Sequence, residues 1–176
     1  MQTLKLPHIS DDPFFFNDIS EIKDVLDKAN IKIGKNFRSS QNTEEWEGLE
    51  IIGENITIGD NVTIVGNVLL EGFWGESGFD TSIQIGDNVT IGGGVLHSRN
   101  YHYVTKIMFG SKVGDNVVIE KYAHIREYSK IEDDCKIGAD ATISVATVSK
   151  GVEVGKKCFV SEGMVLKKDL PDHSRF

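Results

Sequence analysis

The stretch IGDNVTIGGGVLHSRNYH, residues 85–102, carries the pattern that decides the fold. It begins with two six-residue units, IGDNVT and IGGGVL, each with isoleucine first, glycine second and valine fifth. The pattern then breaks in a polar segment that contains His97 and His102. A repeat that stops at a polar, histidine-bearing loop indicates a rigid scaffold that is interrupted to hold functional side chains.

The same six-residue period runs through most of the chain. Its first position is always isoleucine, valine or leucine, and after position 143 the spacing shortens once by one residue: 52, 58, 64, 70, 85, 91, 113, 119, 125, 131, 137, 143, 148, 154, 160 and 166. A second small or aliphatic residue follows four places after most of these, for example at Ile56, Val89, Ala123, Thr147 and Met164. Both sets are expected to point into the core.

Glycine often follows the first position and asparagine often stands three places after it, as in Asn55, Asn61 and Asn88. Both residue types tolerate left-handed backbone, so each unit is interpreted as a short strand followed by a tight corner. A period of six fits neither a helix of 3.6 residues per turn nor alternating strands joined by hairpins. It predicts an all-β coil with flat walls, whose turns stack at the strand spacing of roughly 4.8 Å.

Composition narrows the possible functions. The net charge of −8 argues against nucleic acid and anionic membrane as partners. Because no stretch reaches membrane-spanning length and the first residues are polar, we expect a soluble cytoplasmic protein without membrane insertion. Cys135 and Cys158 fall on the inner positions of the repeat, so they are interpreted as buried filler rather than as a disulfide or a nucleophile.

The chain divides into a lead-in and one repeat domain. Residues 1–30 are predicted to be an irregular lead-in and a short capping helix, which begins near Asp18 with Glu21 three places on. Residues 31–171 form the coil, with protruding loops at about 39–48, 71–82 and 97–112, and residues 172–176 form a tail. The helix is expected to cover the open first turn of the coil.

At these repeats the chain resembles the hexapeptide-repeat acyltransferases. The resemblance implies a left-handed parallel β-helix, acetyl-CoA as co-substrate and a homotrimer. Over roughly residues 52–171 it is closest to the branch of maltose, galactoside and polysaccharide O-acetyltransferases, in which paired units IGDNVxIGxxV precede a histidine loop. The implied activity is acetyl transfer from acetyl-CoA to a hydroxyl of a sugar or polysaccharide precursor.

The resemblance also suggests site residues. In that branch the catalytic histidine follows the last valine of the paired units by seven places, which gives His102 after Val95. An acceptor-binding aspartate stands five places before the first isoleucine, which gives Asp80, with Trp74 and Asn67 as further acceptor residues. A neutral imidazole can take the proton of an attacking hydroxyl, so His102 is expected to be a general base. His97 takes the next aliphatic position and is expected to be structural.

Coenzyme-binding residues are expected near the end of the chain. The segment SEGMVLKKDLP, residues 161–171, resembles GAGSVVTKDVP of the family, in which the lysine helps to hold the coenzyme phosphates. That resemblance assigns Lys168, with Lys167, Ser161 and Gly163 beside it, to coenzyme binding. Lysine is a suitable point charge for phosphate.

Three other interpretations stay open. A nucleotide-sugar N-acetyltransferase would use the same coil. A non-catalytic subunit is a second alternative, since Lys121 and Glu162 replace small residues expected near the coenzyme. A zinc enzyme of the γ-carbonic anhydrase type needs three histidine ligands, and none lies between His8 and His97, so no catalytic metal is expected.

Overall fold

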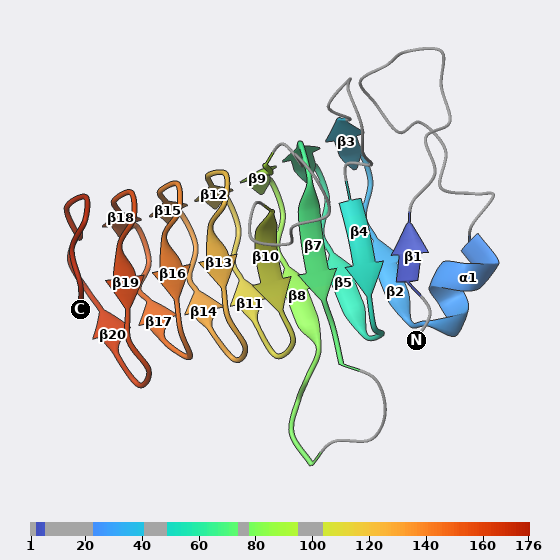
Figure 1. The fold of residues 1–176 in the computed structure, drawn as a ribbon. Coiled ribbons are helices and arrows are strands. Elements are labelled where there is room, and N and C mark those ends of the chain that lie inside the picture. Colours follow the sequence, from blue (N-terminus) through green and yellow to red (C-terminus); the bar gives the residue numbers. More distant parts are fainter. Residues whose placement is uncertain (1–2, 6–22, 41–48, 74–77, 95–103) are drawn as a thin grey trace.

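The computed structural model describes residues 3–5, 23–40, 49–73, 78–94 and 104–176 of the chain. Within these ranges twenty short strands and one six-residue helix, α1 (Lys23–Lys28), follow one another. The strands form three sheets that wind around one axis, and the chain advances along that axis from one end to the other (Figure 1).

Each sheet collects every third strand. Sheet A contains β1 (Thr3–Lys5), β4 (Leu49–Ile52), β7 (Val68–Glu71), β10 (Thr105–Met108), β13 (His124–Ile125), β16 (Thr142–Ile143) and β19 (Phe159–Val160). Sheet B contains β2 (Ile31–Ile33), β5 (Ile56–Ile58), β8 (Ile83–Ile85), β11 (Lys112–Val113), β14 (Lys130–Ile131), β17 (Thr147–Val148) and β20 (Val165–Leu166). Sheet C contains β3 (Arg38–Ser40), β6 (Thr63–Val65), β9 (Thr90–Gly92), β12 (Val118–Ile119), β15 (Lys136–Ile137) and β18 (Glu153–Val154).

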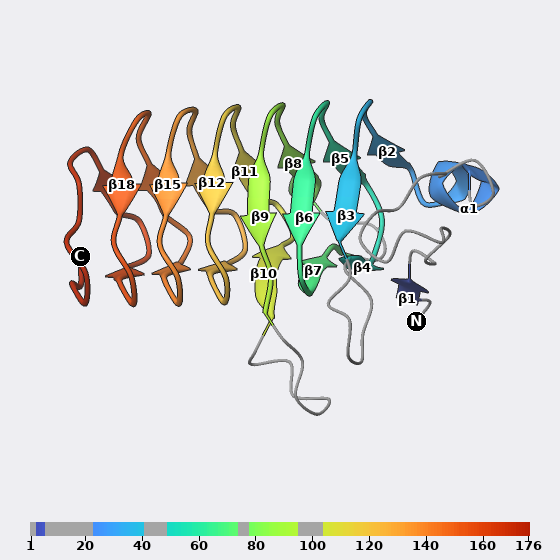
Figure 2. The ribbon, with the colours of Figure 1, turned by 90° about the horizontal axis from the view of Figure 1, so that it is seen from above.

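The three sheets form a left-handed parallel β-helix, as predicted. Seen from the N-terminal end, the chain turns counter-clockwise from sheet A to B to C while it moves away (Figures 1 and 2). We name the corners by the sheets they join: the AB edge, the BC edge and the CA edge. Successive coils pair in parallel, for example β8 with β11 and β9 with β12.

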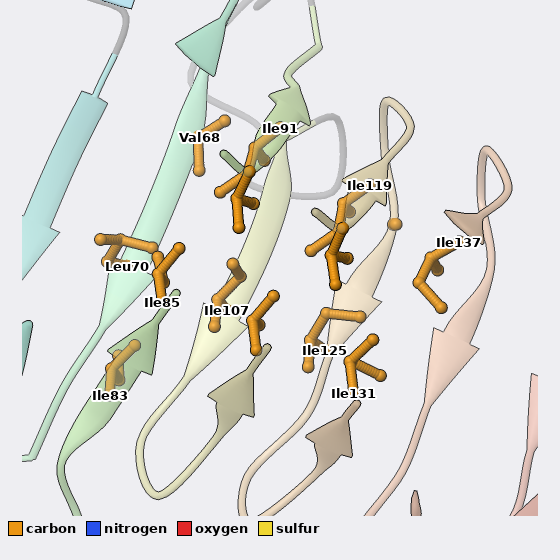
Figure 3. Packing of buried hydrophobic residues seen from close by; sticks show 14 of the residues in the cluster. Val68, Leu70, Ile83, Ile85, Ile91, Ile107, Ile119, Ile125, Ile131 and Ile137 are labelled. Atoms are coloured by element: carbon orange, nitrogen blue, oxygen red, sulfur yellow. The ribbon is translucent and has the colours of Figure 1, made fainter. Parts of the chain in front are cut away.

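The core is a stack of aliphatic side chains inside this prism. Leu70, Ile85, Ile91, Ile107 and Ile119 all point inward and are at most 2% exposed (Figure 3). Burying each such side chain contributes roughly 1.5–3 kcal/mol relative to leaving it in water. Cys135 and Cys158 lie in the same core as free thiols, so their interpretation as filler is confirmed. Burial raises the pKa of the Cys135 thiol.

The predicted inward orientation of the side chain is wrong at three positions. Ile52 is half-buried, because β4 pairs Ile51 with the inward Leu70 and thereby turns Ile51 inside. After Ile143 the corner is one residue shorter, so Ala146, not Thr147, points inward. Met164 is 36% exposed because it lies in the last coil before the end of the prism.

Asparagine side chains build a ladder along the BC edge. The Nδ2 groups of Asn36, Asn61 and Asn88 donate to the Oδ1 atom of the asparagine one coil further on, at 3.0–3.2 Å. Asn116 donates to Asp134 at 3.0 Å and ends the ladder. These five residues have positive φ angles between 56° and 60°, so the predicted use of asparagine at left-handed corners is confirmed.

The N-terminal region differs in part from the expectation. Leu26 of α1 packs into the core beside Ile31, which agrees with a capping helix, while Asp18 and Glu21 lie outside the described residues. Residues Thr3–Lys5 were expected to be irregular but form β1, which pairs antiparallel with β4.

Two of the predicted loops, at 39–48 and 97–112, contain strand residues. β3 includes residues 39 and 40, and β10 spans Thr105–Met108, so both loops are shorter than predicted.

Candidate functional site

Two segments interrupt the coils where function was expected. The 95–103 segment runs from β9 to β10 at the CA edge, and the 72–82 segment runs from β7 to β8 at the AB edge. His97, His102 and Trp74 lie outside the described residues, so their side chains are not placed. The described site therefore consists of the residues at the roots of these segments.

The root of the 95–103 segment is tied to both neighbouring coils. On its N-terminal side, Gly94 exchanges two backbone hydrogen bonds with Asn67 of the preceding coil, at 3.1 and 3.2 Å. On its C-terminal side, the buried hydroxyl of Thr105 donates to the carbonyl of Gly92 at 2.5 Å and accepts from the Tyr122 N–H at 2.8 Å. The start and the end of the segment are thus fixed by backbone and side-chain hydrogen bonds.

Asn67 is an unusual residue at this root. Its side chain is only 5% exposed, and its Oδ1 atom has no hydrogen-bond partner. Leaving a buried polar group unpaired costs roughly 1–3 kcal/mol, so such groups call for an explanation. The unpaired oxygen lies buried at the root of the histidine-bearing segment, so it marks a strained point of the coil next to that segment.

Asp80 is held in place from two directions. Its Oδ1 atom accepts from the hydroxyl of Ser82 at 2.6 Å and from the Ser82 N–H at 3.1 Å. Its Oδ2 atom forms an ion pair with the ammonium group of Lys112 at 3.1 Å. The Ser82 hydrogen bonds, followed by Lys112, lower the pKa of Asp80 from 3.8 to about 2. The carboxylate is thus ionised at neutral pH and remains accessible to a ligand.

A row of aromatic rings along the AB edge was not predicted. The rings of Phe73 and Phe109 lie 5.7 Å apart, and those of Phe109 and Tyr128 lie 5.5 Å apart in an edge-to-face arrangement. Gly110 leaves room for the Tyr128 ring, since a Cβ atom there would come within 2.4 Å of it. The only signal in the sequence is an aromatic residue two or three places after the core positions 70, 107 and 125.

The four expected coenzyme residues lie on either side of β20 in the last coil. Ser161 and Gly163 precede the strand at the AB edge, where their N–H groups donate to Phe176 and Val145. Lys167 and Lys168 follow the strand and are exposed. The two lysines are therefore neighbours in solvent. The two-residue strand β20 separates them from Ser161 and Gly163.

The expected acceptor and base residues do not share an edge within one chain. Asp80 lies at the AB edge, whereas Asn67 and the root of the 95–103 segment lie at the CA edge. Sheet A lies between them (Figures 1 and 2). Within the ranges that the structure covers, no three His, Cys, Asp or Glu side chains gather closely enough to hold a metal ion, and no helix could span a membrane.

Two family models match the chain. One, described as bacterial transferase hexapeptide (six repeats), matches residues 110–145. The other, described as hexapeptide repeat of succinyl-transferase, matches residues 75–96 and 129–168. The matched segments include β8 and β9 and the strands from β11 to β20.

Similar proteins include several transferases. The bifunctional protein GlmU of Listeria monocytogenes is 36% identical over 66 residues, which cover 38% of this chain and 14% of that protein. PerB of Caulobacter crescentus, solved with CoA and GDP-perosamine, is 21% identical with a TM-score of 0.43 over 71% of this chain and 48% of that chain. The acetyltransferase domain of PglB from Neisseria gonorrhoeae, solved with acetyl coenzyme A, is 13% identical with a TM-score of 0.48 over 73% of this chain and 53% of that chain.

This chain thus spans a small part of GlmU and about half of the two solved structures. The matched segments are the six-residue units that build the prism. The chain therefore carries the hexapeptide repeats that these two transferase family models describe.

Proposed function

We propose that the protein is an acetyl-CoA-dependent O-acetyltransferase that acts on a hydroxyl of a sugar or polysaccharide precursor. The observation that carries the proposal is the fixed root of the histidine-bearing 95–103 segment, between Gly94, tied to Asn67, and Thr105. A segment held at both ends can present His102 reproducibly to an acceptor. The matches to two hexapeptide-repeat transferase models support acyl transfer as the class of reaction.

The proposed mechanism is direct transfer in a ternary complex. His102 removes the proton of the acceptor hydroxyl while its oxygen attacks the thioester carbonyl. Backbone N–H groups stabilise the oxyanion, the C–S bond breaks, and the coenzyme leaves as a thiol after the imidazolium returns the proton. Buried Cys135 and Cys158 are poor nucleophiles, which supports a route without an acyl-enzyme.

Asp80 and Asn67 are proposed to bind the acceptor together with Trp74. Asp80 offers an exposed, ionised carboxylate, so it can accept a hydrogen bond from a sugar hydroxyl, while the Asn67 side chain is buried at the root of the 95–103 segment. Lys167, Lys168, Ser161 and Gly163 are proposed to bind the coenzyme. The exposed ammonium groups of the two lysines fit its phosphates.

A homotrimer would bring the proposed acceptor and base residues into one site. Because Asp80 and the 95–103 segment lie on different edges, the AB edge of one chain placed against the CA edge of a neighbour would complete a site between them. A monomer by light scattering at micromolar concentration would contradict this assembly.

The function is tested by measuring release of coenzyme A from acetyl-CoA with panels of sugars and nucleotide sugars. We expect turnover with a neutral hydroxyl acceptor, and Asp80→Ala should reduce it while the affinity for coenzyme A stays nearly unchanged. Turnover only with nucleotide amino sugars would favour the N-acetyltransferase alternative. Absence of coenzyme A binding in calorimetry would favour a non-catalytic subunit.

A further inference from the structure

We propose that Lys112 makes the acceptor site selective for a neutral hydroxyl over a charged amine. This inference rests on the proposed acceptor role of Asp80, and it goes further by naming the residue that sets the charge preference. Lys112 was not among the site residues expected from the sequence. It lies 32 positions after Asp80 and meets it only through the winding of the coil.

The pair is held in position by the backbone on both sides. Lys112 is on β11, where it lies beside Gln84 of β8 in the parallel register. The Gly110 N–H donates to the carbonyl of Thr81 at 3.0 Å, which ties the 78–82 segment to the corner just before Lys112. The 3.1 Å ion pair therefore joins two anchored segments.

The contacts of Asp80 leave limited room for a ligand. Ser82 supplies two donors to Oδ1, and the Lys112 ammonium supplies one to Oδ2. A carboxylate has about four acceptor positions, so about one remains. Because both side chains are about half-exposed, at 57% for Asp80 and 46% for Lys112, an acceptor can reach that position from solvent.

The summed charge of the pair is zero. A ligand hydroxyl can donate to the remaining position of Asp80 without any need for net charge. A ligand ammonium would be attracted by Asp80 and repelled by Lys112, so it gains little over the hydroxyl. One unit-charge interaction at 4 Å in water corresponds to about a fivefold change in binding, which sets the expected scale of the preference.

Two other cations, one on the same sheet and one at the same edge, have ion-pair partners of their own. Lys130, the next residue in the outward column of sheet B, binds Glu132 at 2.9 Å. Arg126 binds Glu127 at 3.0 Å at the same edge. Lys112 is therefore the cation whose removal should expose the charge of Asp80, and Lys130 provides a matched control.

The test compares two acceptors that differ in one group: methyl glucopyranoside and methyl 2-amino-2-deoxyglucopyranoside. Their dissociation constants for the full-length protein are measured by NMR titration, with the backbone amides of Ser82 and Gly110 as reporters. Lys112→Met should shift the preference toward the amino glycoside by about fivefold. Lys130→Met should leave the preference unchanged, and Lys112→Arg should retain that of the wild type.

The inference is overturned if Lys112→Met keeps the wild-type preference, or if the wild type already prefers the amino glycoside. It also fails if neither glycoside shifts the Ser82 and Gly110 amides in any variant. Turnover with the sugar panel is scored separately. If the wild type shows turnover but Lys112→Met does not change the preference, only the role of Lys112 is contradicted. If the wild type shows no turnover, the proposed function is contradicted.

Discussion

The hydroxyl of Thr105 donates a hydrogen bond to the carbonyl of Gly92 at 2.5 Å, and these two residues flank the 95–103 segment. The same hydroxyl accepts the Tyr122 N–H from the next coil at 2.8 Å, and the Thr105 side chain is fully buried. One side chain thus links the strand before the segment, the strand after it and the following coil.

Thr105→Val should slow acetyl transfer by lowering kcat more than it changes KM. The substitution keeps the shape of the side chain but removes both hydrogen bonds, which should cost about 1–3 kcal/mol of unfolding free energy. Thr105→Ser keeps the hydroxyl and should restore kcat. Urea denaturation and steady-state kinetics on the three proteins check this. An equal kcat for the valine and serine variants would contradict a role in positioning the segment.

The fold could be predicted from the sequence because isoleucine, valine or leucine recurs every six residues at the first inward position of each unit. The errors fall where a local event changes the register. At Ile52, pairing of β4 with β7 decides which side chain turns inward, and the repeat alone does not contain that pairing. At Thr147, the corner after Ile143 has one residue fewer than its counterparts, and it closes with left-handed backbone at Val145 (φ of 50°), a conformation that valine rarely adopts.

The candidate site was less accessible to prediction. The resemblance suggested Asp80, but its pairing with Lys112 depends on how the 78–82 segment folds back onto the corner at Gly110. The unpaired amide oxygen of Asn67 likewise results from burial, which cannot be read from the sequence. The spacing of the family motif suggested individual residues such as Asp80. It could not suggest which residues of different coils meet, because that depends on the lengths of the loops between the coils.

Asn88→Ala should lower stability by about 2–3 kcal/mol. The substitution removes two ladder hydrogen bonds, from Asn61 at 3.0 Å and to Asn116 at 3.2 Å, and places alanine at a φ of 57°. Asn88→Gly removes the same bonds but accepts the positive φ, so it should be less destabilising than alanine. Thermal unfolding of the three proteins checks the order. A glycine variant that is less stable than the alanine variant would mean that the backbone angle is unimportant here.

Lys168→Met should raise the KM for acetyl-CoA about fivefold and leave the KM for the acceptor unchanged. The side chain is exposed and can lose its interaction with a phosphate without disturbing the core. Since such an interaction is screened by salt, the difference between variant and wild type should shrink as ionic strength rises. Lys156→Met, another exposed lysine in the last coils, is the control. A matching effect of the control would point to a general effect of charge.

An uncharged patch on sheet C is the best candidate surface for the proposed trimer. Its outward side chains belong to β6, β9 and β12 and include Val65 and Val118, which are 50% and 40% exposed. Val118→Lys should weaken the trimer, because burying an unpaired ammonium in an interface is unfavourable. Val165→Lys, on sheet B and 48% exposed, is the control. Light scattering across a concentration series should show dissociation of the Val118 variant alone, and equal behaviour of both variants would exclude this face.

His102→Ala should lower kcat by about 100-fold or more, the usual scale for loss of a positioned base, with little change in thermal stability. His97→Ala should have the opposite profile, since that residue is proposed to be structural. Each variant is measured for kcat with an acceptor that the wild type turns over, and for melting temperature. Near-normal turnover of the His102 variant, or isolation of an acetylated wild-type enzyme by mass spectrometry, would rule out the proposed mechanism.

The pH dependence of the reaction gives an independent measure of the same base. For the wild type, kcat/KM should fall toward acid pH, because a protonated His102 can no longer accept the hydroxyl proton. Asp80 should not contribute to this loss. Its pKa in the folded protein is about 2, so it stays ionised, and the stability it contributes is present above pH 3.8 and is lost only as the pH falls through 2. His102→Ala should therefore flatten the profile between pH 5 and 8, whereas Asp80→Asn should lower it without changing its shape.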